Sequence, residues 1–259
     1  MKLKVFTPSE IEQFIEEGYV VLREGFPRRV AAEIRARLWE KMGLREDDPA
    51  GWKQPLVHIK EALGGSPFSE VWTQRVFDAF DDLMGAERYR KPQTIGWFPV
   101  SFPGFEAPPW RAPEKGWHVD GIQFHHHVYS RDQGLLPIVI LSDIGPGDGG
   151  TAIDLGSHKL AARILADSEP AGLDIQELGK RVAQHPFKQV VEANGQAGDI
   201  FMHHPMIRHA RSANTGRSVR FICNPCIVLH EHMNLKREHE EDYSPVERAI
   251  VRALAEQTK

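Results

Sequence analysis

Hydrophobic positions at the start of the chain recur every three to four residues, the spacing of an amphipathic helix. The segment 7–18 begins with Thr7, Pro8 and Glu10, which form a capping-box pattern ahead of the apolar positions, and it reaches a stop at Gly18. The following stretch, "GYVVLREGF", is rich in β-branched residues. We therefore expect a helix followed by a short strand.

The same helical spacing returns three times. It predicts helices over 27–43, within 67–85 (starting near Ser69 and stopping at Gly85) and over 244–257. A further helical stretch, about 158–187, interrupts apolar runs of a different kind. An insert of that length between strands often covers the mouth of a barrel, so we expect it to act as a lid.

From about residue 92 short apolar runs alternate with Gly/Pro turns, as in "TIGWFPV", "LLPIVILSDI", "DIFMHH" and "SVRFICNPCIVL". Many short strands separated by turn signals are typical of a β-sandwich or barrel. We expect one domain, with a mostly helical flank (1–91), a β-roll core (92–232) and the C-terminal helix.

Composition narrows the class of partner. The chain has 259 residues, 41% hydrophobic and 26% charged, with a formal net charge of −4. This balance gives no reason to expect nucleic acid or an anionic membrane as partner. No apolar run has the length of a spanning helix, and the first residues do not read as a signal peptide. We expect a cytoplasmic protein with a small-molecule partner; the oligomeric state stays open.

Two cysteines, Cys223 and Cys226, form a C-x-x-C pair in "ICNPCI". This spacing fits a redox pair or half of a zinc site. There is no second cysteine pair, and the segment has the pattern of a strand. We expect two reduced thiols without a role in redox chemistry.

The stretch "GWHVDG" (116–121) carries the first candidate chemistry. In a strand, His118 and Asp120 would share one face, roughly 6.5–7 Å apart, and could both bind a divalent metal. A third ligand could come from His203, His204 or His209, since all three lie in a later strand region. Arg220, past the turn "SANTG", could grip a carboxylate beside the metal.

The order of these motifs resembles the phytanoyl-CoA dioxygenase family of non-haem iron, 2-oxoglutarate-dependent oxygenases. "FTPSEIEQFIEEGYVVL" is similar to the family's opening, and "VHIKEALGGSPFSEVWTQ" looks like its helical segment before the barrel. "WHVDG", "GDGGTAIDLGSHK" and "HARSANTGRSVR" match, in order, its H-x-D, Gly-Ser-His and His…Asn…Arg elements. The likeness covers most of the chain.

The resemblance implies a mainly β fold with α: a double-stranded β-helix (jelly-roll or cupin-like) core flanked by N-terminal helices and a C-terminal helix. It implies Fe(II) ligands His118, Asp120 and His209, with Arg220 on the distal carboxylate of 2-oxoglutarate. Thr151 and Ser212 are further candidates for contact with 2-oxoglutarate. The chain departs from the family pattern at Arg211, Leu155 and Ala152, the first of which replaces a common serine.

On this basis we expect a dioxygenase that uses Fe(II), 2-oxoglutarate and O2 and hydroxylates an unactivated C–H bond of a small metabolite, releasing succinate and CO2. Desaturation or cyclisation stays open, as does the identity of the substrate. The sequence offers five candidate substrate contacts: Trp97, Trp117, Phe124, His126 and Arg208. Which of His125, His126 and His127 faces the pocket is not decided by the pattern.

Two alternatives come from other functional classes. One is a sensor that binds a metal or small molecule on the same barrel without turnover. The other is a cupin-type metal hydrolase or isomerase, whose site usually has more histidines and does not need the arginine. His158, in the Gly-Ser-His element, is expected to contact backbone and not to serve as a fourth ligand.

Overall fold

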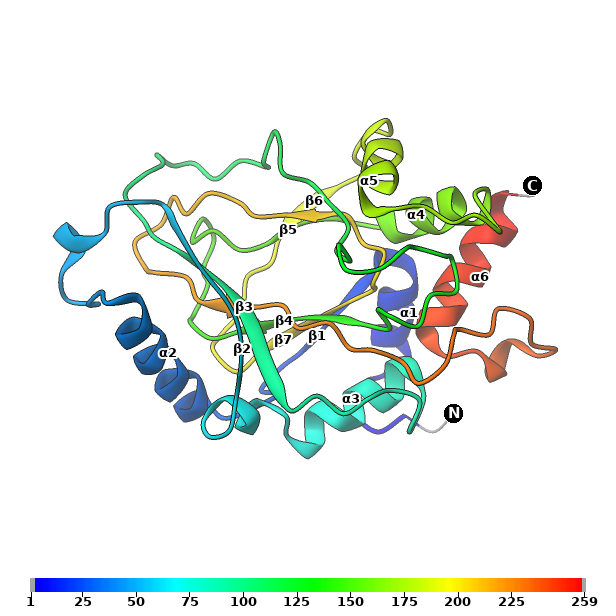
Figure 1. The fold of residues 1–259 in the computed structure, drawn as a ribbon, viewed down its shortest axis with the longest axis horizontal. Coiled ribbons are helices and arrows are strands. Elements are labelled where there is room, and N and C mark those ends of the chain that lie inside the picture. The colour runs from blue at the N-terminus through cyan, green and yellow to red at the C-terminus, as the bar shows by residue number, and fades with distance from the viewer. Residues whose placement is uncertain (1–2, 258–259) are drawn as a thin grey trace.

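The computed structural model describes residues 3–257 and combines antiparallel sheets with helices (Figure 1). Its α-helices are α1 (Pro8–Glu17), α2 (Arg28–Met42), α3 (Gln74–Met84), α4 (Ser157–Ala166), α5 (Ile175–Ala183) and α6 (Pro245–Gln257). Its strands are β1 (Tyr19–Leu22), β2 (Leu56–Gly64), β3 (Thr94–Ser101), β4 (Leu136–Ile140), β5 (Ala152–Asp154), β6 (Val190–Glu192), β7 (Ile200–His203), β8 (His209–Ala210) and β9 (Ile222–Cys223). Short 3₁₀ turns lie at Pro49–Gly51, Phe68–Val71 and Glu240–Asp242.

The helix at the start forms where the sequence predicts it. Thr7 accepts the N–H of Glu10, whose side chain bonds back to the cap, and Gly18 ends α1 in the left-handed region with φ 88°. The helices predicted over 27–43 and 244–257 are also confirmed as α2 and α6. The third begins later than predicted, at Gln74, because Thr73 is its cap and the residues near Ser69 form a 3₁₀ turn.

One element was wrongly interpreted. The stretch that resembles a helical segment of the family contains β2, which pairs antiparallel with β3. Val57, His58, Ile59 and Lys60 alternate apolar and polar, the period of a strand, and the register then shifts at a bulge between Ile59 and Ala62. The first third of the chain therefore contributes two strands as well as helices.

Three antiparallel sheets result, with orders β1-β7-β4-β9, β2-β3 and β6-β5-β8. A bridge between Ser101 and Arg220 joins β3 to the chain just before β9, and another between His118 and His209 extends the three-stranded sheet. The "GWHVDG" stretch is thus a single bridge and not the regular strand that its pattern predicts.

Alternate residues divide the core into two layers. Ile138 and Ile140 of β4 pack with Ile153 of β5 and Ile222 of β9, between the four-stranded and the three-stranded sheet. Val139, between the two β4 isoleucines, belongs to the larger cluster that also contains the buried faces of the helices. The four-stranded sheet therefore has helices on one face and the smaller sheet on the other.

Helices α1, α4 and α6 gather at one end of the sheets (Figure 1). The insert between β5 and β6 is two helices, α4 and α5, and α4 packs against α6. Its expected role as a lid stays a prediction. Between residues 3 and 257, no helix is both long and apolar enough to span a bilayer.

Candidate metal centre

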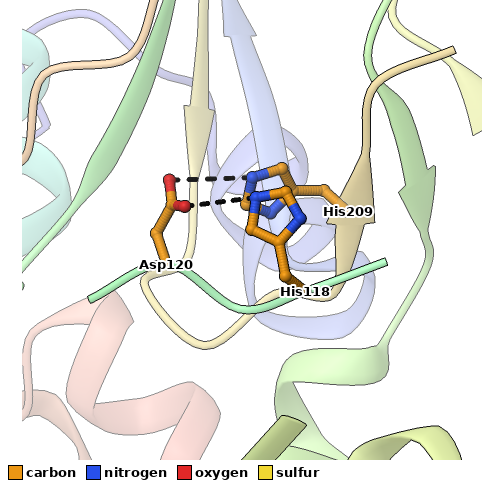
Figure 2. A group of neighbouring side chains, drawn as sticks. All are labelled: His118, Asp120 and His209. Carbon is orange, nitrogen blue, oxygen red and sulfur yellow. Dashed lines mark ion pairs between the residues drawn. The ribbon is translucent and has the colours of Figure 1, made fainter. Parts of the chain in front are cut away.

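His118, Asp120 and His209 come together from two distant parts of the chain (Figure 2). Their ligand atoms lie within 4.8 Å of one another, and no other such group of three occurs in the described part of the chain. The backbone bridge between His118 and His209 brings the two segments side by side. Two imidazoles and one carboxylate form a donor set that suits Fe(II) with coordination positions left open.

Each histidine presents the same ring nitrogen to this centre. Nδ1 of His118 lies 2.8 Å from the Gly116 carbonyl, and Nδ1 of His209 lies 3.1 Å from the Ile207 carbonyl. A carbonyl only accepts, so each Nδ1 carries the proton and each Nε2 keeps its lone pair. These Nε2 atoms lie 3.3 and 3.7 Å from the carboxylate of Asp120.

Asp120 is held by a neutral partner as well. Nδ2 of Asn224 donates to its Oδ2 at 3.1 Å. Burial raises the pKa of Asp120, but His209, His118 and Asn224 together hold it well below its usual range. The carboxylate is therefore ionised at neutral pH, as a metal ligand must be.

The two imidazoles differ in their surroundings. Burial lowers the pKa of His209, which Asp120 only partly offsets. Burial also lowers the pKa of His118, but the protonated ring can donate from Nε2 to Asp120, and this interaction outweighs burial and raises the pKa overall. Without a metal, His118 is thus the more basic ligand.

The two rival histidines do not join this group. His204 accepts the N–H of Met206 and donates to the Val246 carbonyl, so both ring nitrogens are used. His203 packs behind His209, with ring centroids 6.1 Å apart, and its buried nitrogens have no partner in the described residues. Burial lowers the pKa of His203 to about 3, so it stays neutral.

Arg220 is a fully buried cation without a carboxylate partner in the described chain. Its Nη2 donates to the Pro99 carbonyl at 3.3 Å, and its Nε has no partner. Burial first, and then the charge of Arg211, lowers its pKa to about 9. Because a buried, unpaired guanidinium is costly, this arrangement favours an anionic ligand at Arg220.

Arg220 shares a face with the metal centre. It lies two residues before Ile222, which packs between the sheets, and Asn224 lies two residues further on. This row of alternate residues therefore leads from the guanidinium of Arg220 to the amide that holds Asp120. Asn224 is not among the site residues that the sequence predicts, although the period of two from Arg220 could have indicated it.

The two other candidates for contact with 2-oxoglutarate are buried nearby. The hydroxyl of Ser212 donates to the Gly150 carbonyl, which leaves its lone pairs as acceptors. Thr151 lies next to Gly150 and two residues before Ile153, on the face between the sheets. Both roles stay predictions.

The structure does not favour the predicted contact of Arg208 with substrate. Its guanidinium forms a buried ion pair with Asp154, with 2.6 Å between Nη2 and Oδ2, and also donates to the carbonyls of Val182, His185 and Pro186. Arg208 precedes His209, so the two side chains point to opposite faces. Its donors are therefore used up on the face away from the metal centre.

The aromatic candidates separate into two groups. Trp117 packs at a tilt on Phe187, with ring centroids 4.7 Å apart, and Phe187 covers the Arg208 guanidinium, so Trp117 belongs to the face turned away from His209. The rings of Phe124 and His126 pack together beside Gly121, which directly follows Asp120. The rings of His125 and His127 contact each other. Trp97 is 55% exposed on β3 beside the bulge.

The contacts of His158 and the burial of the two cysteines indicate structural roles for these residues. Nε2 of His158 lies 2.9 Å from the Ile15 carbonyl, which confirms the expected backbone contact. Cys223 and Cys226 are free, and burial raises the pKa of Cys226 to about 12. A thiol with so high a pKa is a poor nucleophile and a poor metal ligand at neutral pH.

Comparison with solved structures shows the same fold at low identity. The structure of EctD from S. alaskensis in its apoform matches with a TM-score of 0.53 at 18% identity, over 88% of this chain and 79% of that one. The epimerase SnoN in complex with Fe3+, alpha ketoglutarate and nogalamycin RO gives a TM-score of 0.55 at 18% identity, over 85% and 82%. HygX from Streptomyces hygroscopicus with nickel, 2-oxoglutarate and hygromycin B bound gives a TM-score of 0.50 at 15% identity, over 86% and 87%.

A search of curated proteins finds no match. The family model for phytanoyl-CoA dioxygenase (PhyH) matches residues 14–222, which include the three clustered side chains and Arg220. The chain therefore belongs to the phytanoyl-CoA dioxygenase family.

Proposed function

We propose that the protein is a non-haem Fe(II), 2-oxoglutarate-dependent dioxygenase that hydroxylates a C–H bond of a small metabolite. The observation that carries the proposal is the pairing of two sites. One is the cluster of His118, Asp120 and His209, and the other is the buried, unpaired guanidinium of Arg220 on the same face. A keto acid with a second carboxylate would use both at once.

Each residue has a distinct part in this reaction. His118 and His209 would hold the metal through Nε2, and the Gly116 and Ile207 carbonyls fix both rings in the required tautomer. Asp120 would supply the anionic ligand. Arg220 would orient 2-oxoglutarate by binding its distal carboxylate. Bound iron supplies the oxidising chemistry, in which 2-oxoglutarate and O2 give succinate, CO2 and one oxygen atom for the substrate.

The alternatives account for less of the site. A cupin-type hydrolase would use the metal cluster but would leave the buried Arg220 without a counter-ion. A non-catalytic sensor would use both features and differs only in turnover. HygX and SnoN, which share the fold, were crystallised with 2-oxoglutarate or alpha ketoglutarate, which supports the assignment of this co-substrate. We also propose a double-stranded β-helix for the two facing sheets.

The decisive experiment measures succinate release from 2-oxoglutarate by the iron-loaded protein under air, over a panel of small metabolites. We expect release that depends on substrate, Fe(II) and O2. His118→Ala and Asp120→Ala should each lose at least 99% of the activity because a ligand is missing. His239→Ala, at an exposed histidine far along the chain, is the matched control. Full activity of either ligand variant, or no succinate with any substrate, would refute the proposal.

Arg220→Met tests the second half of the site. It replaces a buried, unpaired charge by an apolar chain of similar length, so the folded protein should not lose stability. The KM for 2-oxoglutarate should rise by about one to two orders of magnitude, because the charged hydrogen bonds are lost. Steady-state kinetics and a thermal melt separate these effects. An unchanged KM would show that Arg220 does not bind the co-substrate.

A further inference from the structure

Three exposed basic residues lie in the region around the buried Arg220. His58 and Arg211 are close to Arg220, and Lys60 is close to His58. His58 of β2 is paired with Pro99, whose carbonyl accepts the hydrogen bond from Arg220. Lys60 is two residues further along β2. The side chain of His58 therefore lies beside the guanidinium of Arg220, nearer to solvent.

Arg211 reaches the same region from the smaller sheet. It follows β8 directly, two residues after the metal ligand His209, and its side chain is exposed. The Ser212 hydroxyl binds the Gly150 carbonyl, which keeps the chain beside the β5 segment, and Asn214 then donates to Ser101. Arg211 thus lies where the chain crosses from β8 toward the bridge between Ser101 and Arg220.

The positive charges of this region repel one another, and a bound anion would offset that repulsion. Burial is the main cause that lowers the pKa of both Arg220 and His58, and the positive charge of Arg211 lowers both further, so these groups lie close enough to repel one another. Neither Lys60 nor Arg211 has an ion-pair partner in the described residues, and Glu61, beside Lys60, is paired with Lys41.

A count of charges shows what is missing. Lys60, Arg211 and Arg220 carry three positive charges. Two carboxylates count against them: that of Asp120 in the metal centre and that of Glu192, whose charge raises the pKa of Arg220. Glu192 already accepts the N–H groups of Gly147 and Gly150. The two charges of a metal ion would be matched by the two carboxylates of 2-oxoglutarate. One positive charge is left over, on the exposed side of this region, where Lys60 and Arg211 lie.

We propose that Arg211, with His58 and Lys60, forms a subsite that binds an anionic oxygen group, carboxylate or phosphate, of the substrate to be oxidised. This inference rests on the proposed function and adds to it the class of substrate, an acidic metabolite. Arg220 alone holds the co-substrate. The guanidinium of Arg211 suits either anion, because its parallel N–H donors match two oxygens of one group.

The test titrates acetate and methyl phosphate into the Zn(II)-loaded, 2-oxoglutarate-saturated protein and follows binding by NMR. We expect one of the two anions to bind saturably, with a Kd of about 1–10 mM. Arg211→Gln should weaken this binding at least tenfold and leave the affinity for 2-oxoglutarate within twofold. Arg217→Gln, an exposed arginine in the same loop, should change neither. The anion that binds identifies the group that the substrate carries.

Three results would overturn the inference: no saturable binding of either anion, wild-type binding by Arg211→Gln, or an equal loss of 2-oxoglutarate affinity in that variant, which would assign Arg211 to the co-substrate. If the wild-type protein does not bind 2-oxoglutarate, the proposed function fails instead. The anion titration is then repeated on Arg220→Met without 2-oxoglutarate, where Arg211 is still tested.

Discussion

At the scale of single residues, the contact between Asn224 and Asp120 should set the affinity for metal. The amide donates to Oδ2 at 3.1 Å and fixes the carboxylate without adding charge. Partners of this kind typically contribute 10–100-fold in affinity. We expect Asn224→Ala to weaken Fe(II) or Co(II) binding about tenfold, measured by competition with a chromophoric chelator. The thermal melt of the metal-free variant should stay close to wild type, and unchanged metal affinity would contradict this role.

The residue pattern predicted which side chains meet, but not what surrounds them. His118, Asp120 and His209 could be proposed because their spacing and order match a known element, and they do cluster. Arg208 and Arg220 look alike in sequence. Arg208 faces Asp154, and Arg220 faces no carboxylate of the described chain. That difference depends on which residue lies across the sheet, which a single strand does not reveal.

At the scale of elements, long helices were predictable and short β segments were not. Helix α1 has its own cap, periodic apolar face and terminal glycine, so local signals suffice. Ile59 is the one buried residue of strand β2, so the apolar alternation of this strand is weak and its conformation depends on pairing with β3. The two residues of β8 likewise take their strand conformation from β5 and from the bridge to His118.

The Arg208–Asp154 pair should stabilise the packing of the segment at the end of α5 on the smaller sheet. Arg208→Met leaves the buried Asp154 carboxylate without its partner, and removal of one partner of such a pair costs about 3–5 kcal/mol. Urea denaturation should show this loss in the free energy of unfolding. Arg208→Met combined with Asp154→Leu should recover part of it, because no buried charge remains unpaired. A single variant as stable as wild type would show that the pair is unimportant.

At the scale of the whole molecule, contacts between distant segments hold the helices against the sheets. Helix α6 packs on α1, α3 and α4, and Lys159 of α4 reaches Glu16 of α1 and Glu256 of α6. Another ion pair, between Arg252 and Glu12, joins residues that are 240 positions apart in sequence. Periodicity indicates each helix and its apolar face, but it contains no information on which helix covers which sheet.

Glu247 connects α6 to the rest of the protein, and its ionisation should make the free energy of unfolding depend on pH. It is 1% exposed and accepts hydrogen bonds from Arg88 and from the N–H groups of Ser244 and Asn234. Burial alone would raise the pKa of Glu247, but these donors outweigh it and lower the pKa from 4.5 to about 2. The shift corresponds to about 3 kcal/mol of stability at pH 7.

The sign follows from the direction of that shift. A carboxyl whose pKa is lower in the folded state stabilises fully above its unfolded pKa, and the contribution disappears as the pH falls through the folded value. Glu247→Gln should therefore lower the free energy of unfolding by about 3 kcal/mol at pH 7, and the difference from wild type should shrink steadily between pH 4.5 and pH 2. Urea titrations at several pH values measure it, with Glu241→Gln at an exposed carboxylate as control. A difference that is the same at pH 3 and pH 7 would mean that shape, and not charge, is what Glu247 contributes.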